Sequence, residues 1–378
     1  MPQRATLYFH AIIHTMDERL PLADALVIQG DRIAMIGHVH DLEDALPPGT
    51  IRIDLEGQSV VPGFNDCHAH ILGFGLSLNE ANVSVDAVSS IPETVDVLRR
   101  RLVSTGEHEW LIGRGYDQNM LAEHRHPNRN DLDAATSQRP IVLAHTSGHV
   151  LTCNSAALER AGITAGTPDP PGGEIERDEH GVPTGVLKET ATQLVNRMIP
   201  EPSAEQGAAA IVRAMQVMAG FGITSATDAA TGQGTSAEPQ LEMYRSALSS
   251  GKLAGRISLV PRIEYVAPPD TGEIHAKHEF DAGDQPEWLA ISGAKIFSDG
   301  AMSTRTAALR SPYADDAQNY GILLWETPVL LNMMRRAHTA GWQIVTHALG
   351  DRAVETVLDC YQQVLTGDHH GEHRHRIE

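Results

Sequence analysis

The segment that decides the fold is TPVLLNMMRRAHTAG–WQIVTHALGD–RAVETVLDCYQQVLT, residues 327–366. Residues 327–341 and 352–366 predict two helices, and the apolar run that opens 342–351 predicts a strand between them. This strand leads into the polar residues of THALGD. A strand enclosed by two helices is the repeating unit of a parallel sheet that helices cover.

The same alternation extends back to about residue 200. The expected helices are 204–222 and 241–251, and the expected strands are 223–230, 256–265, 288–300 and the start of one at 374–378. Several of these strands end in His, Lys or Asp. Because the active site of a parallel barrel lies at the carboxyl ends of its strands, this pattern predicts a barrel with a site at that face.

The chain before residue 200 is organised differently. Residues 1–59 predict short strands, with a hairpin at Gly30-Asp31, and form a small β-rich unit. Residues 60–78 predict a first barrel strand and the loop that follows it. Residues 79–199 predict an insertion, which contains a Pro/Gly-rich loop and a hairpin within 167–189. The predicted barrel therefore comprises 60–78 and 200–378.

Composition excludes several classes of protein. The 378 residues include 49 Asp and Glu against 29 Lys and Arg, a formal net charge of −20, so we expect no nucleic-acid partner. No apolar run reaches about 18 residues, so we expect no membrane span. Three widely spaced cysteines form no disulfide framework, and the N-terminus lacks a signal-peptide pattern. We therefore expect a cytoplasmic protein.

Histidine is abundant, with 20 residues, and it forms four His-x-His pairs: His38/His40, His68/His70, His124/His126 and His373/His375. The 68/70 pair follows the strand VVPGFND, where residues i and i+2 point to the same side. Two imidazoles on one side can bind one metal ion. The other pairs lie at a domain edge or in polar segments, which are usually solvated.

Two further strand residues are candidates for the same chemistry. Lys295 lies within the apolar strand of SGAKIFSDG. It either reaches a carboxylate such as Asp299, or it is a desolvated amine that adds CO₂ and bridges two metals as a carbamate. His347 ends the strand WQIVTH and is placed for the site, although a lone histidine there is more often a packed residue.

Together these residues resemble the amidohydrolase superfamily, in the branch called amidohydrolase family 3, which includes enzymes similar to N-substituted formamide deformylase. The resemblance runs from about residue 7 to residue 378. The motifs that carry it, in the family's order, are VVPGFNDCHAH, WLIGRGYDQN, SGHVLTCNSAAL, PDPPGGEIERDEHGVPTGVL, GAKIFSDGAMSTRTAAL, THALGDRAV and RHRIE.

The resemblance implies a (β/α)₈ TIM-like barrel with a small N-terminal β-sandwich and an insertion after the first strand. It also implies one or two divalent metal ions, usually zinc. His68, His70, Lys295 and His347 match the family's metal ligands, and Lys295 matches the lysine that can be carboxylated. Tyr116 and His149 of the insertion are candidates to cover the substrate pocket, with a purely structural role as the alternative.

The chain departs from the family in two places. The family's sixth-strand block reads RIEH, and its final histidine is a ligand, whereas this sequence ends at Glu378. The aspartate that serves as general base at the end of the eighth strand is also absent. We therefore interpret the chain as a truncated barrel of about six strands. Weakened metal affinity, negligible turnover and self-association through unpaired sheet edges are the expected consequences.

The function that the resemblance implies is hydrolysis of a non-peptide C–N bond in a small-molecule amide by metal-activated water. Two alternatives stay open. The chain is a catalytically inactive remnant of such an enzyme, or the same metal site hydrolyses esters.

Overall fold

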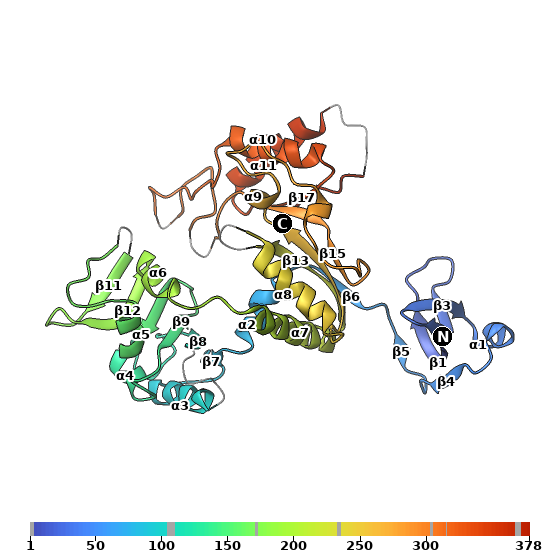
Figure 1. Ribbon diagram of the computed structural model, residues 1–378, viewed down its shortest axis with the longest axis horizontal. Helices are drawn as coiled ribbons and strands as arrows, with labels where there is room; N and C mark the ends of the chain where they lie inside the picture. Colours follow the sequence, from blue (N-terminus) through green and yellow to red (C-terminus); the bar gives the residue numbers. More distant parts are fainter. Residues whose placement is uncertain are drawn as a thin grey trace. The chain divides into compact units, whose positions relative to one another are not determined.

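Four β-sheets organise the part of the chain that the computed structural model describes, which is residues 4–103, 110–170, 173–232, 236–302, 305–314, 316–366 and 372–378 (Figure 1). The chain divides into two units, Met1–Asn65 with Gly222–Ser225, and Asp66–Phe221 with Ala226–Glu378. Parts of two predicted segments, residues 171–172 and 303–304, lie outside the described residues.

The first unit is built on one small sheet. Its strands are β1 (Ala5–His14), β2 (Leu22–Gln29), β3 (Arg32–Gly37), β4 (Ile51–Asp54) and β5 (Ser59–Val60). They lie in the order β3-β2-β1-β4, and β5 pairs with β1. The predicted hairpin joins β2 to β3, where Gly30 adopts a φ of 67° that a residue with a side chain rarely adopts.

A second sheet gathers strands from residues 81–189. These are β7 (Ala81–Asn82), β8 (Leu111–Tyr116), β9 (Ile141–His145), β10 (Val150–Cys153), β11 (Gly173–Arg177) and β12 (Pro183–Glu189), in the order β11-β12-β10-β9-β8-β7. The helices α3 (Ile91–Leu102), α4 (Arg129–Asp133), α5 (Ser155–Arg160) and α6 (Gln193–Asn196) belong to the same stretch of chain. Ser90 caps α3 by accepting from the Glu93 N–H.

The two remaining sheets form one arc of strands. The strands are β6 (Phe64–Ala69), β13 (Ile223–Thr231), β14 (Arg256–Pro261), β15 (Leu289–Ile291), β16 (Gly293–Phe297), β17 (Gln343–His347) and β18 (Arg376–Ile377). Their orders are β15-β14-β13-β6 and β16-β17-β18, and a parallel bridge between Arg262 and Lys295 connects β14 to β16. Within the described ranges these strands do not close into a ring.

Two observed strands differ from the predicted ones: one ends earlier, and the other is interrupted. The strand expected over 256–265 ends at Pro261, because the Arg262 N–H donates to the Thr231 carbonyl and the short helix α9 (Ile263–Val266) begins there. The strand expected over 288–300 is interrupted at Ser292. β15 pairs with β14 on one side of this break, and β16 pairs with β17 on the other.

The longer helices of this region are α7 (Ala204–Gly220), α8 (Glu238–Ser249), α10 (Thr327–Thr339) and α11 (Asp351–Leu365). Ser203 and Gln206 form a capping box at the start of α7, which satisfies two backbone N–H groups that the helix cannot pair internally. No helix among the described residues combines the length and the apolar character needed to cross a membrane.

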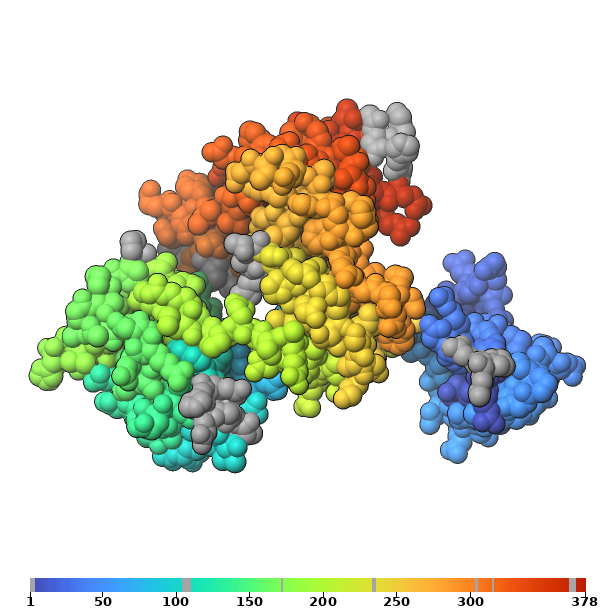
Figure 2. Space-filling view, in the orientation of Figure 1, coloured from blue at the N-terminus to red at the C-terminus, as the bar shows by residue number. Residues whose placement is uncertain are grey.

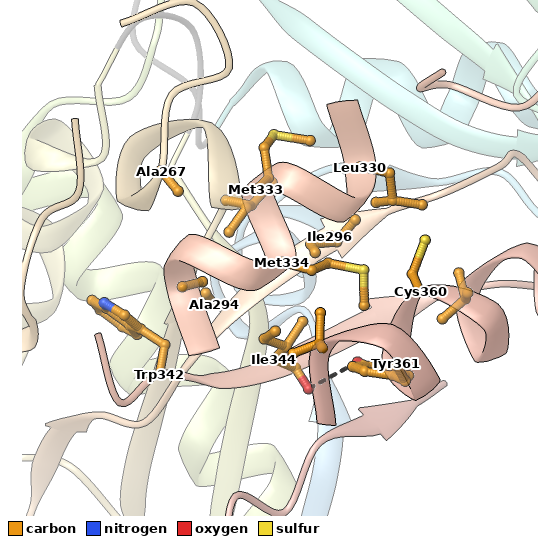
Figure 3. Close-up of a cluster of buried hydrophobic side chains, with 14 of the residues drawn as sticks. Ala267, Ala294, Ile296, Leu330, Met333, Met334, Trp342, Ile344, Cys360 and Tyr361 are labelled. Atoms are coloured by element: carbon orange, nitrogen blue, oxygen red, sulfur yellow. Dashed lines mark hydrogen bonds between the residues drawn. The ribbon is translucent and has the colours of Figure 1, made fainter. Parts of the chain in front are cut away.

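A hydrophobic cluster packs α10 and α11 against β16 and β17 (Figure 3). Ile296 and Ile344 contribute from the strands, and Leu330, Met333 and Met334 contribute from α10. In the space-filling view of Figure 2, the surface of this part of the chain is orange to red. This packing fixes the two strands that carry Lys295 and His347.

We expect the Leu330→Ala substitution to destabilise this cluster by about 2–5 kcal/mol, because it removes buried methyl groups and leaves a cavity. Leu330 is 1% exposed, whereas Leu358 on the neighbouring α11 is 53% exposed. Leu358→Ala is therefore a matched control, with an expected change within about 0.5 kcal/mol. Urea denaturation followed by circular dichroism measures both. Equal effects of the two substitutions would contradict the packing.

Candidate functional site

The two histidines of the 68/70 pair lie side by side. His68 is on β6, and His70 immediately precedes α2 (Ile71–Ser77). Their ring centroids are 5.4 Å apart, and the ring planes are nearly perpendicular. Helix α2 approaches α7 so closely at Gly75 that a Cβ there would lie 2.1 Å from the Ala210 carbonyl oxygen. The requirement for glycine therefore helps to set the position of the segment that follows His70.

Lys295 is fully buried on β16, and its amine contacts the Glu378 carboxylate. Glu378 Oε1 also lies 2.9 Å from His68 Nδ1, and Glu378 Oε2 lies 3.1 Å from Arg376 Nε. The expectation that Lys295 pairs with Asp299 is wrong, because Glu378 takes that place. Asp299 accepts instead from the backbone N–H groups of residues 308, 349 and 350.

The electrostatics of this pair follow from burial and charge. Burial lowers the pKa of Lys295, and the hydrogen bond that its amine donates to Glu378 opposes that shift. Burial acts to raise the pKa of Glu378, but the bonds from Lys295 and His68 outweigh it, so that this pKa is lowered. Glu378 therefore stays a carboxylate beside two nitrogen donors.

Asp228 on β13 stands beside His70 and was missed by the sequence analysis. Its side chain is 5% exposed, and Oδ2 accepts from the Ile71 N–H at 2.9 Å and from the Tyr244 hydroxyl. Partial burial lowers the pKa of His70, and the charge of Asp228 opposes this shift. The signal that could have found Asp228 is its place near the end of the predicted strand 223–230, beside the strand of His68.

His347 ends β17 and pairs in register with Phe297 of β16. Its Nε2 lies 3.1 Å from the Gly300 carbonyl oxygen and 3.7 Å from Asp299 Oδ1. The structure thus brings His68, His70 and Lys295 into one neighbourhood with Glu378, and it gives His347 a separate set of contacts. That His68, His70, Lys295 and His347 together bind a metal ion stays a prediction.

The donors at this site have the right chemistry for a divalent metal. Imidazole nitrogens and carboxylate oxygens are the ligands that zinc takes in proteins. The His68 Nδ1 contact to Glu378 leaves Nε2 of the same ring as the nitrogen for a metal. Among the residues that the structure describes, however, no three His, Cys, Asp or Glu side chains are grouped closely enough to hold an ion.

Tyr116 lies in a second polar cluster, on the sheet of β7–β12. Its side chain is fully buried, and its hydroxyl lies 3.0 Å from His126 Nδ1 and 2.9 Å from Thr152 Oγ1. The His145 ring is 5.1 Å from the Tyr116 ring and 5.8 Å from that of His126. These contacts are those of a structural residue, and the proposed role of Tyr116 in substrate binding stays a prediction.

His149 follows β9 and contacts a residue with unusual backbone geometry. Its Nδ1 lies 2.8 Å from Glu189 Oε2, and Glu189 has a φ of 51°. The pair links the start of β10 to the end of β12, which are neighbouring strands. Its role toward a substrate also stays a prediction.

Comparison with known proteins gives a consistent result. A family model described as "Amidohydrolase family" matches residues 52–378. The chain is 30% identical to Protein LONG AFTER FAR-RED 3 of Arabidopsis thaliana over 98% of its length, which is 63% of that relative. It is 28% identical to N-substituted formamide deformylase of Arthrobacter pascens over 96% of its length, which is 66% of that relative.

A solved structure matches as well. It is an uncharacterized metal-dependent hydrolase from Pyrococcus horikoshii OT3, with 26% identity, a TM-score of 0.75, and coverage of 99% of this chain and 69% of that one. The predicted fold class, a metal-dependent hydrolase barrel fold, is confirmed by this likeness. The chain spans less than two thirds of the length of the two relatives named above.

Acidification is expected to destabilise the cluster around Tyr116. Burial lowers the pKa of His126 and of His145, so the folded state takes up protons less readily than the unfolded state, whose histidines titrate near pH 6.5. The unfolded state then binds more protons, and stability falls as the pH falls through that value. Denaturation of the wild-type protein at about pH 7.5 and about pH 5.5 measures this loss.

The His126→Asn/His145→Asn double variant is expected to lose less stability over the same pH interval. His180→Asn is the control, because His180 is 78% exposed in the turn between β11 and β12. A pH dependence that is the same in the double variant and in the wild-type protein would contradict this assignment.

Proposed function

Because the chain belongs to the amidohydrolase family, we propose that the whole protein is a metal-dependent hydrolase that cleaves a non-peptide C–N bond in a small-molecule amide. The observation that carries the proposal is the pairing of His68 and His70 beside a buried Lys295 and Glu378. His68 lies near the end of β6 and Glu378 directly follows β18, and the carboxyl ends of strands are where barrel enzymes hold their active sites.

The substrate class rests on a named relative. N-substituted formamide deformylase acts, by its name, on an amide whose nitrogen carries a substituent. We propose the same class of bond for this protein. A small uncharged amide also suits a protein with a formal net charge of −20, which would repel anionic substrates.

We propose zinc as the metal, with His68, His70 and His347 as the residues that would hold it, and Lys295 as a further ligand in the carboxylated form that its amine can adopt. A bound divalent ion polarises a carbonyl oxygen and lowers the pKa of bound water toward about 7. The chain's own residues prepare the site. Asp228 holds the backbone that follows His70, and Glu378 holds the His68 ring.

The His68→Gln/His70→Gln double variant tests the proposal in the full-length protein. We expect it to abolish zinc-dependent release of formate from N-substituted formamides, because two of the proposed ligands are lost. The matched control is His38→Gln/His40→Gln, which removes another His-x-His pair, one whose members contact Asp24 and Asp41 on the surface. This control is expected to keep the wild-type rate.

The same assay separates the alternatives. Hydrolysis of simple esters without hydrolysis of formamides would replace the proposed activity with esterase activity. Zinc binding without turnover on either class would identify an inactive relative. Full formamide hydrolysis by the His68→Gln/His70→Gln variant would show that the site lies elsewhere.

A further inference from the structure

Glu378 is not one of the proposed metal ligands, but its carboxylate contacts several residues at the candidate site. Its Oε1 accepts a hydrogen bond from the Lys295 amine and lies 2.9 Å from His68 Nδ1. Its Oε2 lies 3.1 Å from Arg376 Nε. We propose that Glu378 is a positioning residue that fixes His68 with the proton on Nδ1 and the lone pair on Nε2. The inference rests on the proposed metal site.

The backbone of Glu378 places its side chain. The Glu378 N–H donates to the Thr346 carbonyl oxygen at 2.8 Å, and the Glu378 carbonyl accepts from the Ala348 N–H at 3.2 Å. These bonds continue the pairing of β18 with β17 and leave the residue little freedom. The carboxylate is 12% exposed, and the Lys295 amine that meets it is fully buried. Glu378 is therefore held from both its backbone and its side chain.

A second contact ties the same strand to the His68 segment. Arg376 donates from Nη2 to the carbonyl oxygen of Cys67 at 3.0 Å, one residue before His68. Arg376 thereby joins β18 to β6 through the main chain, while Glu378 joins them through the imidazole. Two independent contacts thus set the distance between the carboxylate and the His68 ring.

The geometry determines which nitrogen of His68 carries a proton. A carboxylate can only accept a hydrogen bond, so the nitrogen that faces Glu378 must be the donor. The neutral ring then has its lone pair on Nε2. In metal sites, a ligating histidine usually donates its other N–H to a carboxylate or carbonyl, and loss of that partner typically weakens metal binding about 10- to 100-fold.

The chain offers a direct comparison at the other histidines. His70 lies beside Asp228, which binds the Ile71 N–H and Tyr244, and no hydrogen bond from the His70 ring to Asp228 is seen among the described residues. His347 donates toward the Gly300 carbonyl through Nε2. Of the three proposed histidine ligands, His68 is thus the one whose ring nitrogen lies at hydrogen-bond distance from a carboxylate.

The test combines imidazole nitrogen-15 NMR with zinc titration of the full-length protein. His68 is assigned by loss of its signal in His68→Gln. In the metal-free wild-type protein we expect the Nδ1–H form of His68. In Glu378→Ala we expect the Nε2–H form that free histidine favours, because no acceptor then faces Nδ1. Zinc affinity of this variant, measured against a chromophoric chelator, is expected to fall about 10- to 100-fold.

Two companion variants separate positioning from folding. Glu378→Asp retains the charge and is expected to recover the Nδ1–H form and part of the zinc affinity. Glu372→Gln is the control, since Glu372 is 85% exposed and pairs with Arg374 in the same short segment. It is expected to change neither measurement. Thermal melting monitored by circular dichroism verifies that each variant is folded.

The outcomes distinguish this inference from the proposed function. An Nε2–H form of His68 in the wild-type protein overturns the inference, and so does a zinc affinity that Glu378→Ala leaves unchanged. Loss of hydrolysis with the tautomer and the zinc affinity as expected overturns the proposed activity alone. A tautomer change in Glu378→Ala that is absent in Glu378→Asp supports the positioning role, whatever substrate is found.

Discussion

The burial of the Lys295 amine within β16 is the constraint on which the arrangement of the candidate site depends. A charge in the interior is costly without a partner, and removal of one partner from a buried ion pair typically costs about 3–5 kcal/mol. Glu378 supplies that partner from β18, and its carboxylate also contacts His68 on β6. The Lys295–Glu378 pair therefore connects β16, β18 and β6.

Two other carboxylates stabilise the backbone around the proposed ligands. Asp228 receives the N–H that follows His70, and Asp299 receives three backbone N–H groups in the loops after β16 and β17. Both side chains are almost fully buried. If one of these hydrogen bonds were lost, the N–H and the carboxylate oxygen would have no water to bond with instead. Hydrogen bonds to these two carboxylates thus help to hold the segments that carry His70 and His347.

The strands divide their two faces between stability and chemistry. Successive side chains of a strand point to opposite faces, so Ala294 and Ile296 of β16 meet the helices while Lys295 points away from them. On β17, Ile344 packs in the same cluster and His347 lies at the end of the strand. Substitutions in the cluster of Figure 3 are therefore expected to affect folding before they affect the site.

By itself, the sequence determined the elements and the spacing of the first histidine pair. Apolar periodicity predicted the helix, strand and helix of residues 327–366 closely, because a buried helix face and a buried strand each impose a period on the sequence. The i, i+2 rule predicted that His68 and His70 would lie side by side, and it succeeded because the two residues are only two positions apart where β6 ends.

Only the tertiary structure decided which carboxylate meets Lys295. Asp299 is four residues away in sequence, but it is occupied by backbone N–H groups, and Glu378 is 83 residues away. The contact depends on how β6, β16 and β18 approach one another, which the pattern of any single strand does not encode. The sequence placed charged groups at strand ends, and the packing of those strands determined which of the groups paired.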